Sequence, residues 1–180
     1  MQQLVPITPP QLTDLWSSTT GSVIGIGWAP GDRFEVLVEV GFATLPIESD
    51  SLVSAGLPVD ADDPLEGGGI DLGLFQGGFR YGFTASSSTF LPYLVFQGGL
   101  LRFTPQDLRR TGESEAIENP PGENVLFTNN EIVPLVSLGF GLDVRVAGPV
   151  VLFAEARAAF GLTEREGTAL LPLRLGLSLR

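Results

Sequence analysis

The sequence of 180 residues contains no cysteine, no histidine and no lysine, and all ten of its basic residues are arginine. Without histidine or cysteine, a Ser-His-Asp triad, a thiol nucleophile and the usual zinc sites are excluded. The formal net charge of −11 argues against a nucleic-acid partner, because that binding depends on clustered basic residues. We therefore expect a protein without catalytic residues, metal ligands, a cofactor or a bound nucleic acid.

Long apolar runs are also absent. No stretch approaches the roughly 18 uninterrupted apolar residues of a membrane-spanning helix, so any crossing of a membrane must use strands. The hydrophobic content of 43% and the positive mean hydropathy are sufficient for an ordered core. A chain of this length is expected to form a single domain, 1–180.

Alternation of apolar and polar residues, interrupted by turn residues, predicts eight strands and no helix. The predicted strands are 2–8, 21–29, 33–46, 70–83, 90–103, 132–146, 150–163 and 170–180. The first is the most weakly marked. Within 70–83, Leu72 and Leu74 are in one phase of the alternation and Phe79 is in the other, which predicts a bulge at Gly77–Gly78.

The last predicted strand has leucine at every second position from Leu171 to Leu179, with Arg174 among the residues between. Similar apolar rows begin at Phe34, Val136 and Leu152. A soluble protein would bury these rows, whereas a membrane barrel turns them to lipid and encloses the polar rows.

The connections between strands alternate in length. Those after Ala29, Phe83 and Val146 are short, whereas 47–69 and 104–131 are long and acidic. This asymmetry is typical of outer-membrane barrels. The sequence therefore predicts an all-β fold, an eight-stranded antiparallel up-and-down transmembrane β-barrel in the cell outer membrane, with lipid as its surroundings.

The polar rows would then line the lumen. An eight-stranded barrel has room only for side chains in its interior, so charged groups of both signs should pair there and form a plug instead of a pore. The predicted lumen network consists of Glu35, Glu39, Arg80, Arg102, Asp143, Arg145, Glu155, Arg157 and Arg174. Glycines in the same rows suit a crowded interior.

Aromatic residues near the predicted strand ends suggest two girdles at the membrane interfaces. These residues are Trp16, Trp28, Phe34, Phe42, Phe83, Phe90, Phe103 and Phe160.

Two acidic groupings could carry chemistry. Glu35 and Glu39 share a face and could act as an acid–base pair, but the surrounding arginines favour ion pairing. The segment 60–66 could gather oxygens for calcium, but it lacks the spacing and the glycine of an EF-hand loop, so a solvated acidic loop is favoured.

Three segments resemble the porin-family outer-membrane β-barrel domains. Residues 90–103, FLPYLVFQGGLLRF, are similar to that family's Pro-Tyr-x-x-x-Gly-x-Gly strand, and 150–157 with 171–177 are similar to its last hairpin. The resemblance implies an eight-stranded antiparallel barrel in a Gram-negative outer membrane, generally without enzymatic activity. The chain departs from the family pattern in ending at Arg180 where an aromatic is usual, and in its weak first strand. From these departures we expect either trimmed ends or a barrel that another chain completes or protects.

The expected function is structural or adaptor-like, with the acidic loops or the barrel seam docking another envelope protein. Two alternatives remain open. One is a binding or transport barrel for a small hydrophobic ligand, which an apolar upper lumen would favour. The other is a soluble lipid-binding barrel, in which the leucine rows would face inward.

Overall fold

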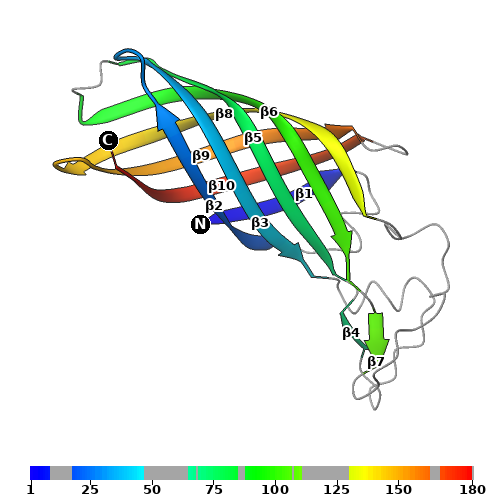
Figure 1. Cartoon of the computed structure of the whole chain (residues 1–180). Coiled ribbons are helices and arrows are strands. Elements are labelled where there is room, and N and C mark those ends of the chain that lie inside the picture. Colours follow the sequence, from blue (N-terminus) through cyan, green and yellow to red (C-terminus); the bar gives the residue numbers. More distant parts are fainter. Residues whose placement is uncertain are drawn as a thin grey trace.

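The computed structural model describes residues 1–8, 18–46, 65–67, 69–84, 88–106, 108–110, 130–162 and 167–179. Eight strands form a closed barrel (Figure 1). They are β1 (Gln2–Thr8), β2 (Thr19–Trp28), β3 (Phe34–Leu45), β5 (Ile70–Gly82), β6 (Phe90–Pro105), β8 (Glu131–Ala147), β9 (Val150–Leu162) and β10 (Gly167–Leu179). Two short strands, β4 (Leu65–Gly67) and β7 (Leu108–Arg110), pair with each other outside the barrel. In the described ranges no helix is long and apolar enough to cross a membrane.

Every strand of the barrel pairs antiparallel with its neighbours in the chain, and β10 pairs with β1 to close the ring. This confirms the predicted eight-stranded up-and-down barrel. The largest difference from a predicted boundary is three residues, at the start of the last strand, which was expected at 170 and begins at Gly167. The first strand, the weakest prediction, forms over the expected range.

The two ends of the barrel differ in their connections. Three connections that lie between consecutive strands at one end are short: 29–33, 83–89 and 148–149. We call this the turn end. Gly148, between β8 and β9, has a φ of 52°, which glycine adopts at little cost. At the opposite end, the loop end, 46–69 and 106–130 connect the strands, and β4 of one pairs with β7 of the other.

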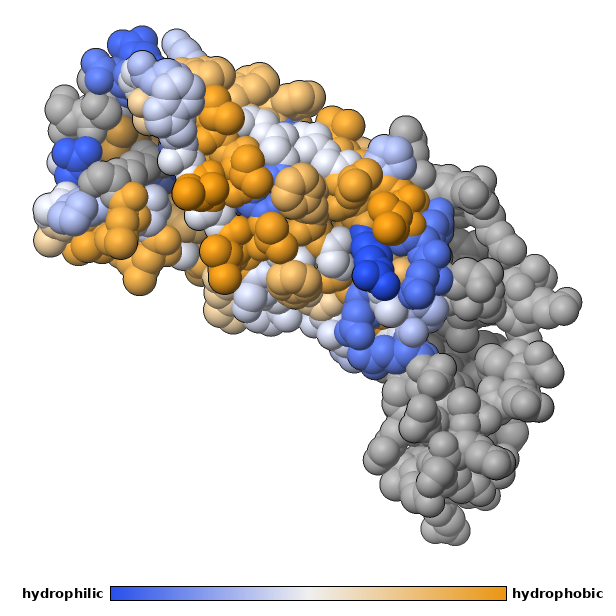
Figure 2. Space-filling view, in the orientation of Figure 1, coloured by the Kyte–Doolittle hydropathy of each residue, from blue (hydrophilic) through white to orange (hydrophobic). Residues whose placement is uncertain are grey.

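The outer face of the barrel is apolar. Along β3 and from Ile132 to Asp143 of β8, exposed side chains that are nearly all apolar alternate with side chains that are buried or partly buried, as the sequence predicts. Leu173, Leu175, Leu177 and Leu179 of β10 are exposed, whereas Arg174 between them is 96% buried. Figure 2 shows the resulting apolar belt, with polar residues at both of its ends. We call this surface the apolar belt.

The predicted bulge at Gly77–Gly78 is wrong. β5 pairs with β3 and with β6 without any register shift, so Leu72 and Leu74 face the lumen and Phe79 faces outward in one continuous alternation. The phase change in the sequence has another cause. The lumen is apolar near the loop end, so apolar residues occupy both faces of the strands there.

The lumen therefore has two layers. At the loop end, buried apolar side chains from seven strands pack into one cluster: Leu4, Leu45, Ile70, Leu72, Leu101, Phe103, Val133, Leu135, Ala159 and Leu170. The middle of the barrel and its turn end contain the buried charged and amide side chains. The expectation of a polar interior holds for this second layer only.

Candidate functional site in the barrel lumen

Arg157 of β9 is the centre of the polar layer, and 2% of its side chain is exposed. Its Nη1 and Nη2 donate to the two carboxylate oxygens of Glu39, over 2.9 and 3.2 Å, in a bidentate pair. Its Nε donates to Glu155, and its Nη1 also contacts the side-chain carbonyls of Gln76 and Gln97. Because these partners lie on β3, β5, β6 and β9, a single guanidinium ties together opposite sides of the lumen.

Arg174 of β10 extends the same network to the seam of the barrel. Its Nη1 lies 2.8 Å from Oε2 of Glu39, which therefore contacts two guanidinium groups. Its Nε donates to the side-chain carbonyl of Gln2 on β1, over 2.9 Å. The ladder pairs Gln2 with Arg174 as well, so the polar network and the backbone hold the closing strands together at the same level.

Nearer the turn end, Arg80 of β5 makes ion pairs with Glu35 and, over 3.4 Å, with Asp143. The Arg80 guanidinium also lies 4.6 Å from the centre of the Tyr93 ring, a cation–π distance. The Tyr93 hydroxyl donates to Glu155 over 3.1 Å, which joins this group to the one around Arg157. Among these residues, four carboxylates face three guanidinium groups, so the charges nearly balance.

Glycines provide the space that these large side chains occupy. A Cβ atom on Gly141 would overlap the Tyr93 ring and would lie 2.8 Å from the Ala154 carbonyl oxygen. A Cβ on Gly139 would lie 2.5 Å from Cγ of Arg157. The glycines of the polar rows therefore leave space for the neighbouring large side chains, as predicted for a crowded interior.

Most of the predicted lumen residues lie where the sequence places them. Glu35, Glu39, Arg80, Asp143, Glu155, Arg157 and Arg174 are joined in the network described above. Arg102 does not lie in the lumen, because its position on β6 faces outward and is exposed. Arg145 is exposed at the turn end, beyond the buried layer, although its phase on β8 is the inward one.

Sequence reasoning missed the neutral members of the network. Gln2, Gln76, Tyr93, Gln97 and Ser137 are buried, and four of them bond to the charged residues. The alternation could have identified them, because it places these amides and hydroxyls at inward positions. Buried groups of this kind need polar partners.

Six of the eight predicted interface aromatics lie on the outer face of the barrel, and their place at the membrane interfaces stays a prediction. Trp28, Phe34, Phe42, Phe83, Phe90 and Phe160 are exposed on the outer face. The prediction for Phe103 is wrong, because its side chain faces inward and is fully buried in the apolar cluster. Trp16 lies outside the described residues.

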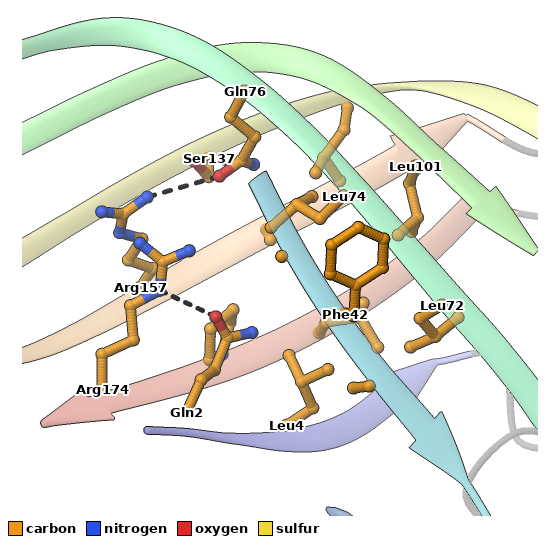
Figure 3. Close-up of a pocket in the computed structure, with 16 residues that line it drawn as sticks. Gln2, Leu4, Phe42, Leu72, Leu74, Gln76, Leu101, Ser137, Arg157 and Arg174 are labelled. Carbon is orange, nitrogen blue, oxygen red and sulfur yellow. Dashed lines mark hydrogen bonds between the residues drawn. The ribbon is translucent and has the colours of Figure 1, made fainter. Parts of the chain in front are cut away.

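A small cavity of about 20 Å³ lies where the two layers of the lumen meet. Figure 3 shows Gln2, Gln76, Ser137 and the two arginines at one end of it, and Leu72 and Leu101 at the other. Such a volume has room for a single water molecule. The described residues contain no group of three or more carboxylates placed to hold a metal ion.

Comparisons with known proteins bear on the fold. No family model and no curated protein matches the sequence. The crystal structure of Neisserial surface protein A matches with a TM-score of 0.57 and 12% sequence identity, over 99% of this chain and 92% of that one. At this identity the likeness shows the fold alone, and porin-family membership stays a prediction. The chain is a small, closed, eight-stranded antiparallel β-barrel similar to that surface protein.

Proposed function

We propose that this protein is a barrel of the cell outer membrane that has a structural or adaptor role and no enzymatic activity. Its acidic loops, 47–69 and 104–131, or the barrel seam, would dock other envelope components. The likeness to a Neisserial surface protein supports a surface location.

One observation carries this proposal: the barrel is apolar outside and charged inside. Exposed apolar side chains occur on β2, β3, β5, β6, β8, β9 and β10, while three arginines are almost completely buried. In water this arrangement would expose hydrocarbon all round the barrel and bury charge, each at a large free-energy cost. In a bilayer the same arrangement is favourable.

The ion-pair network supports a sealed interior. Its members come from seven of the eight strands and meet across the lumen around Arg157 and Glu39. A network of this kind would block the passage of water and ions at that level. We therefore propose a plugged barrel and not an open pore.

A gel mobility experiment tests the membrane barrel. The protein is refolded in detergent and run with and without boiling. We expect a compact, faster band that converts to the unfolded position only after boiling, since a closed barrel resists detergent. Purification as a monomer that stays soluble without detergent would contradict the proposal.

A second candidate function is favoured by the apolar cluster at the loop end. Ten buried apolar residues pack together in this part of the lumen, beside the small interior cavity. These apolar surroundings suit a small hydrophobic ligand. The structure does not favour the soluble lipid-binding barrel. That alternative requires leucine rows that face inward, whereas the row from Leu173 to Leu179 faces outward.

A further inference from the structure

β1 extends only part of the way along the barrel. Its ladder with β2 ends at Gly21, and the backbone of Met1, just before it, bonds to Leu175 of β10 over 3.0 Å. The N-terminus therefore lies part-way along the barrel (Figure 1). Toward the turn end, β2 continues over 22–28 and β10 over 176–179. Among the described residues, no strand pairs with either segment on the side of β1.

The two unpaired backbone edges face each other across the place that a longer β1 would occupy. The described strands β2 and β10 make almost no direct contact, because β1 lies between them in the sheet. In an antiparallel ladder, successive residues direct their N–H and C=O groups alternately to the two neighbouring strands. Every second residue of each segment therefore presents a backbone donor and acceptor to this place. We call the pair of edges, 22–28 and 176–179, the open seam.

Side-chain exposure shows the same missing neighbour. Ile24 is 81% exposed, but Val40, its partner across the ladder, is 38% exposed. Leu177 is 70% exposed, and its partner Leu152 is 48% exposed. Each pair shares one level and one face of the barrel, and only Ile24 and Leu177 lie next to the open seam. Their extra exposure is that of side chains with a neighbouring strand on one side only.

Such an edge is costly inside a bilayer. The outward side chains of the open seam belong to the apolar belt, so lipid would surround it in the proposed membrane location. Lipid cannot bond to backbone N–H and C=O groups, and this is why membrane barrels close their edges. One added strand would satisfy both edges at once, as happens where an extended segment adds to an exposed sheet edge.

The register of β1 defines the side chains that such a strand needs. Continued beyond Met1, it places one position level with Ile24 and Leu177, which face outward. The next position lies level with Gly25 and Ser178, which face the lumen. An added strand therefore needs apolar side chains at its outward positions. Between them it needs a side chain that fits the polar layer of the lumen.

Carboxylates lie beside that inward position. Cγ of Glu39 lies 2.9 Å from the place of a Cβ atom on Gly25. Cδ of Glu35 lies 3.0 Å from the place of a Cβ atom on Gly27. Both glutamates belong to the network in which four carboxylates face three guanidinium groups. A lysine or arginine at the inward position would bring the fourth positive charge.

We propose that the open seam binds an extended segment of a partner protein as an added strand between β2 and β10. The segment alternates apolar residues, which face lipid, with a basic residue, which faces Glu35 and Glu39. It enters from the turn end, because β1 occupies the loop-end part of the same line. This inference gives the adaptor role proposed above an edge and a kind of partner, and it rests on the proposed membrane location.

Disulfide trapping of a peptide tests the site. The chain has no cysteine, so a single one can be introduced as Ile24→Cys, Leu177→Cys or Val40→Cys. Val40 is the matched control, because it also faces outward on the apolar belt but lies on β3, which is paired on both edges. The probe is a short amidated peptide with a serine tail that ends in leucine, lysine, cysteine and threonine. In the register of β1 its cysteine lies level with Ile24 and Leu177.

We expect Ile24→Cys and Leu177→Cys to trap the peptide in detergent and Val40→Cys to trap almost none. Methylation of the peptide's backbone nitrogens should remove most of the product, because it removes the ladder donors. Exchange of its lysine for glutamate should do the same, and an unchanged yield would contradict the basic residue. Equal trapping by all three variants would show simple partitioning of the peptide and overturn the seam site.

Heat-modifiability separates this inference from the proposed function. If the protein gives a heat-modifiable band but neither Ile24→Cys nor Leu177→Cys traps the peptide, the seam site is wrong and the membrane barrel stands. A protein that stays soluble without detergent contradicts the membrane barrel and the seam site with it. Disulfide-linked dimers of Ile24→Cys without the peptide would indicate a second copy at the seam and overturn the partner strand.

Amide exchange of the unmodified protein needs no variant. Every second amide over 22–28 should exchange on the order of tenfold or more faster than the amides of 93–99 on β6, where both edges are paired. Adding the peptide should slow these exposed amides. Uniform protection over 22–28 without the peptide would show that the edge is already filled and would overturn the proposal.

Discussion

Single residues inside this barrel are constrained by their partners across the lumen. Arg157 contacts four side chains on four strands, and Gly141 leaves the space that the Tyr93 ring fills. In such an interior a buried charge needs oppositely charged partners. A glycine is required where a large neighbouring side chain fills the space that a side chain at its position would occupy. Both properties can be tested by substitution.

Arg157→Met should destabilise the barrel by about 3–5 kcal/mol, because it leaves Glu39 and Glu155 as buried carboxylates with fewer cationic partners. The measurement is urea unfolding of the refolded protein in vesicles. Arg33→Met is the control: Arg33 is exposed in the turn before β3, and its replacement should change the free energy of unfolding by about 0.5 kcal/mol or less. Equal effects of the two substitutions would show that the network contributes nothing specific.

Gly141→Ala should cost about 1–3 kcal/mol, because the added methyl group overlaps the Tyr93 ring and displaces its hydroxyl from Glu155. Gly31→Ala serves as the control, since no atom lies within 4 Å of the added methyl group there. The same unfolding experiment compares them. A neutral Gly141→Ala would mean that the ring has other space available.

At the scale of the strand, the two faces of each barrel strand lie in different surroundings: one faces outward and the other faces the lumen. On β8 the outward row runs from Ile132 near the loop end to Val146 near the turn end, and the inward row is buried from Val133 to Asp143. If lipid surrounds the barrel, the cost of a charge on the exposed row depends on its depth in the bilayer. If water surrounds it, depth has no meaning.

Phe140→Arg and Val146→Arg separate these two cases on one face of one strand. Both side chains are about equally exposed, at 60% and 58%, but Phe140 lies in the middle of β8 and Val146 at its turn end. In a bilayer we expect Phe140→Arg to cost about 2–4 kcal/mol and Val146→Arg about 0–1 kcal/mol. The free energy of unfolding in vesicles measures the difference. Equal small costs would argue for a water-exposed surface.

At the scale of the whole molecule, the eight strands close into a ring and side chains occupy the lumen that this ring encloses. The ring closes through β1, and the residues it encloses fill the lumen in two layers, one apolar and one charged. The interior cavity between the two layers is only about 20 Å³, and on this filling we base the proposal that the lumen has no continuous channel. The molecule as a whole is therefore expected to be a closed body in the membrane.

Planar-bilayer recording checks this expectation. The protein should insert without producing steady conductance steps, because the lumen of an eight-stranded barrel is filled by its side chains. The variant Arg157→Ala with Glu39→Ala and Gln97→Ala removes side chains that meet across the centre of the lumen, and it should conduct. Steady steps from the unmodified protein would contradict the plug.

The sequence by itself determined the eight strands of the barrel, their bounds to within three residues, the outward direction of the apolar rows and seven members of the lumen network. Local alternation is enough for these, because a strand has a strict period of two and a barrel has only two faces. Only the tertiary structure decided the places where both faces are apolar. There the period of two does not distinguish inward from outward positions. The directions of Phe103 and Leu72 and the absence of a bulge at Gly77–Gly78 could therefore not be predicted. The tertiary structure also decided which charges meet and where the ladder between β2 and β3 ends, because ion pairs and ladder ends depend on the register between strands, which no single strand encodes.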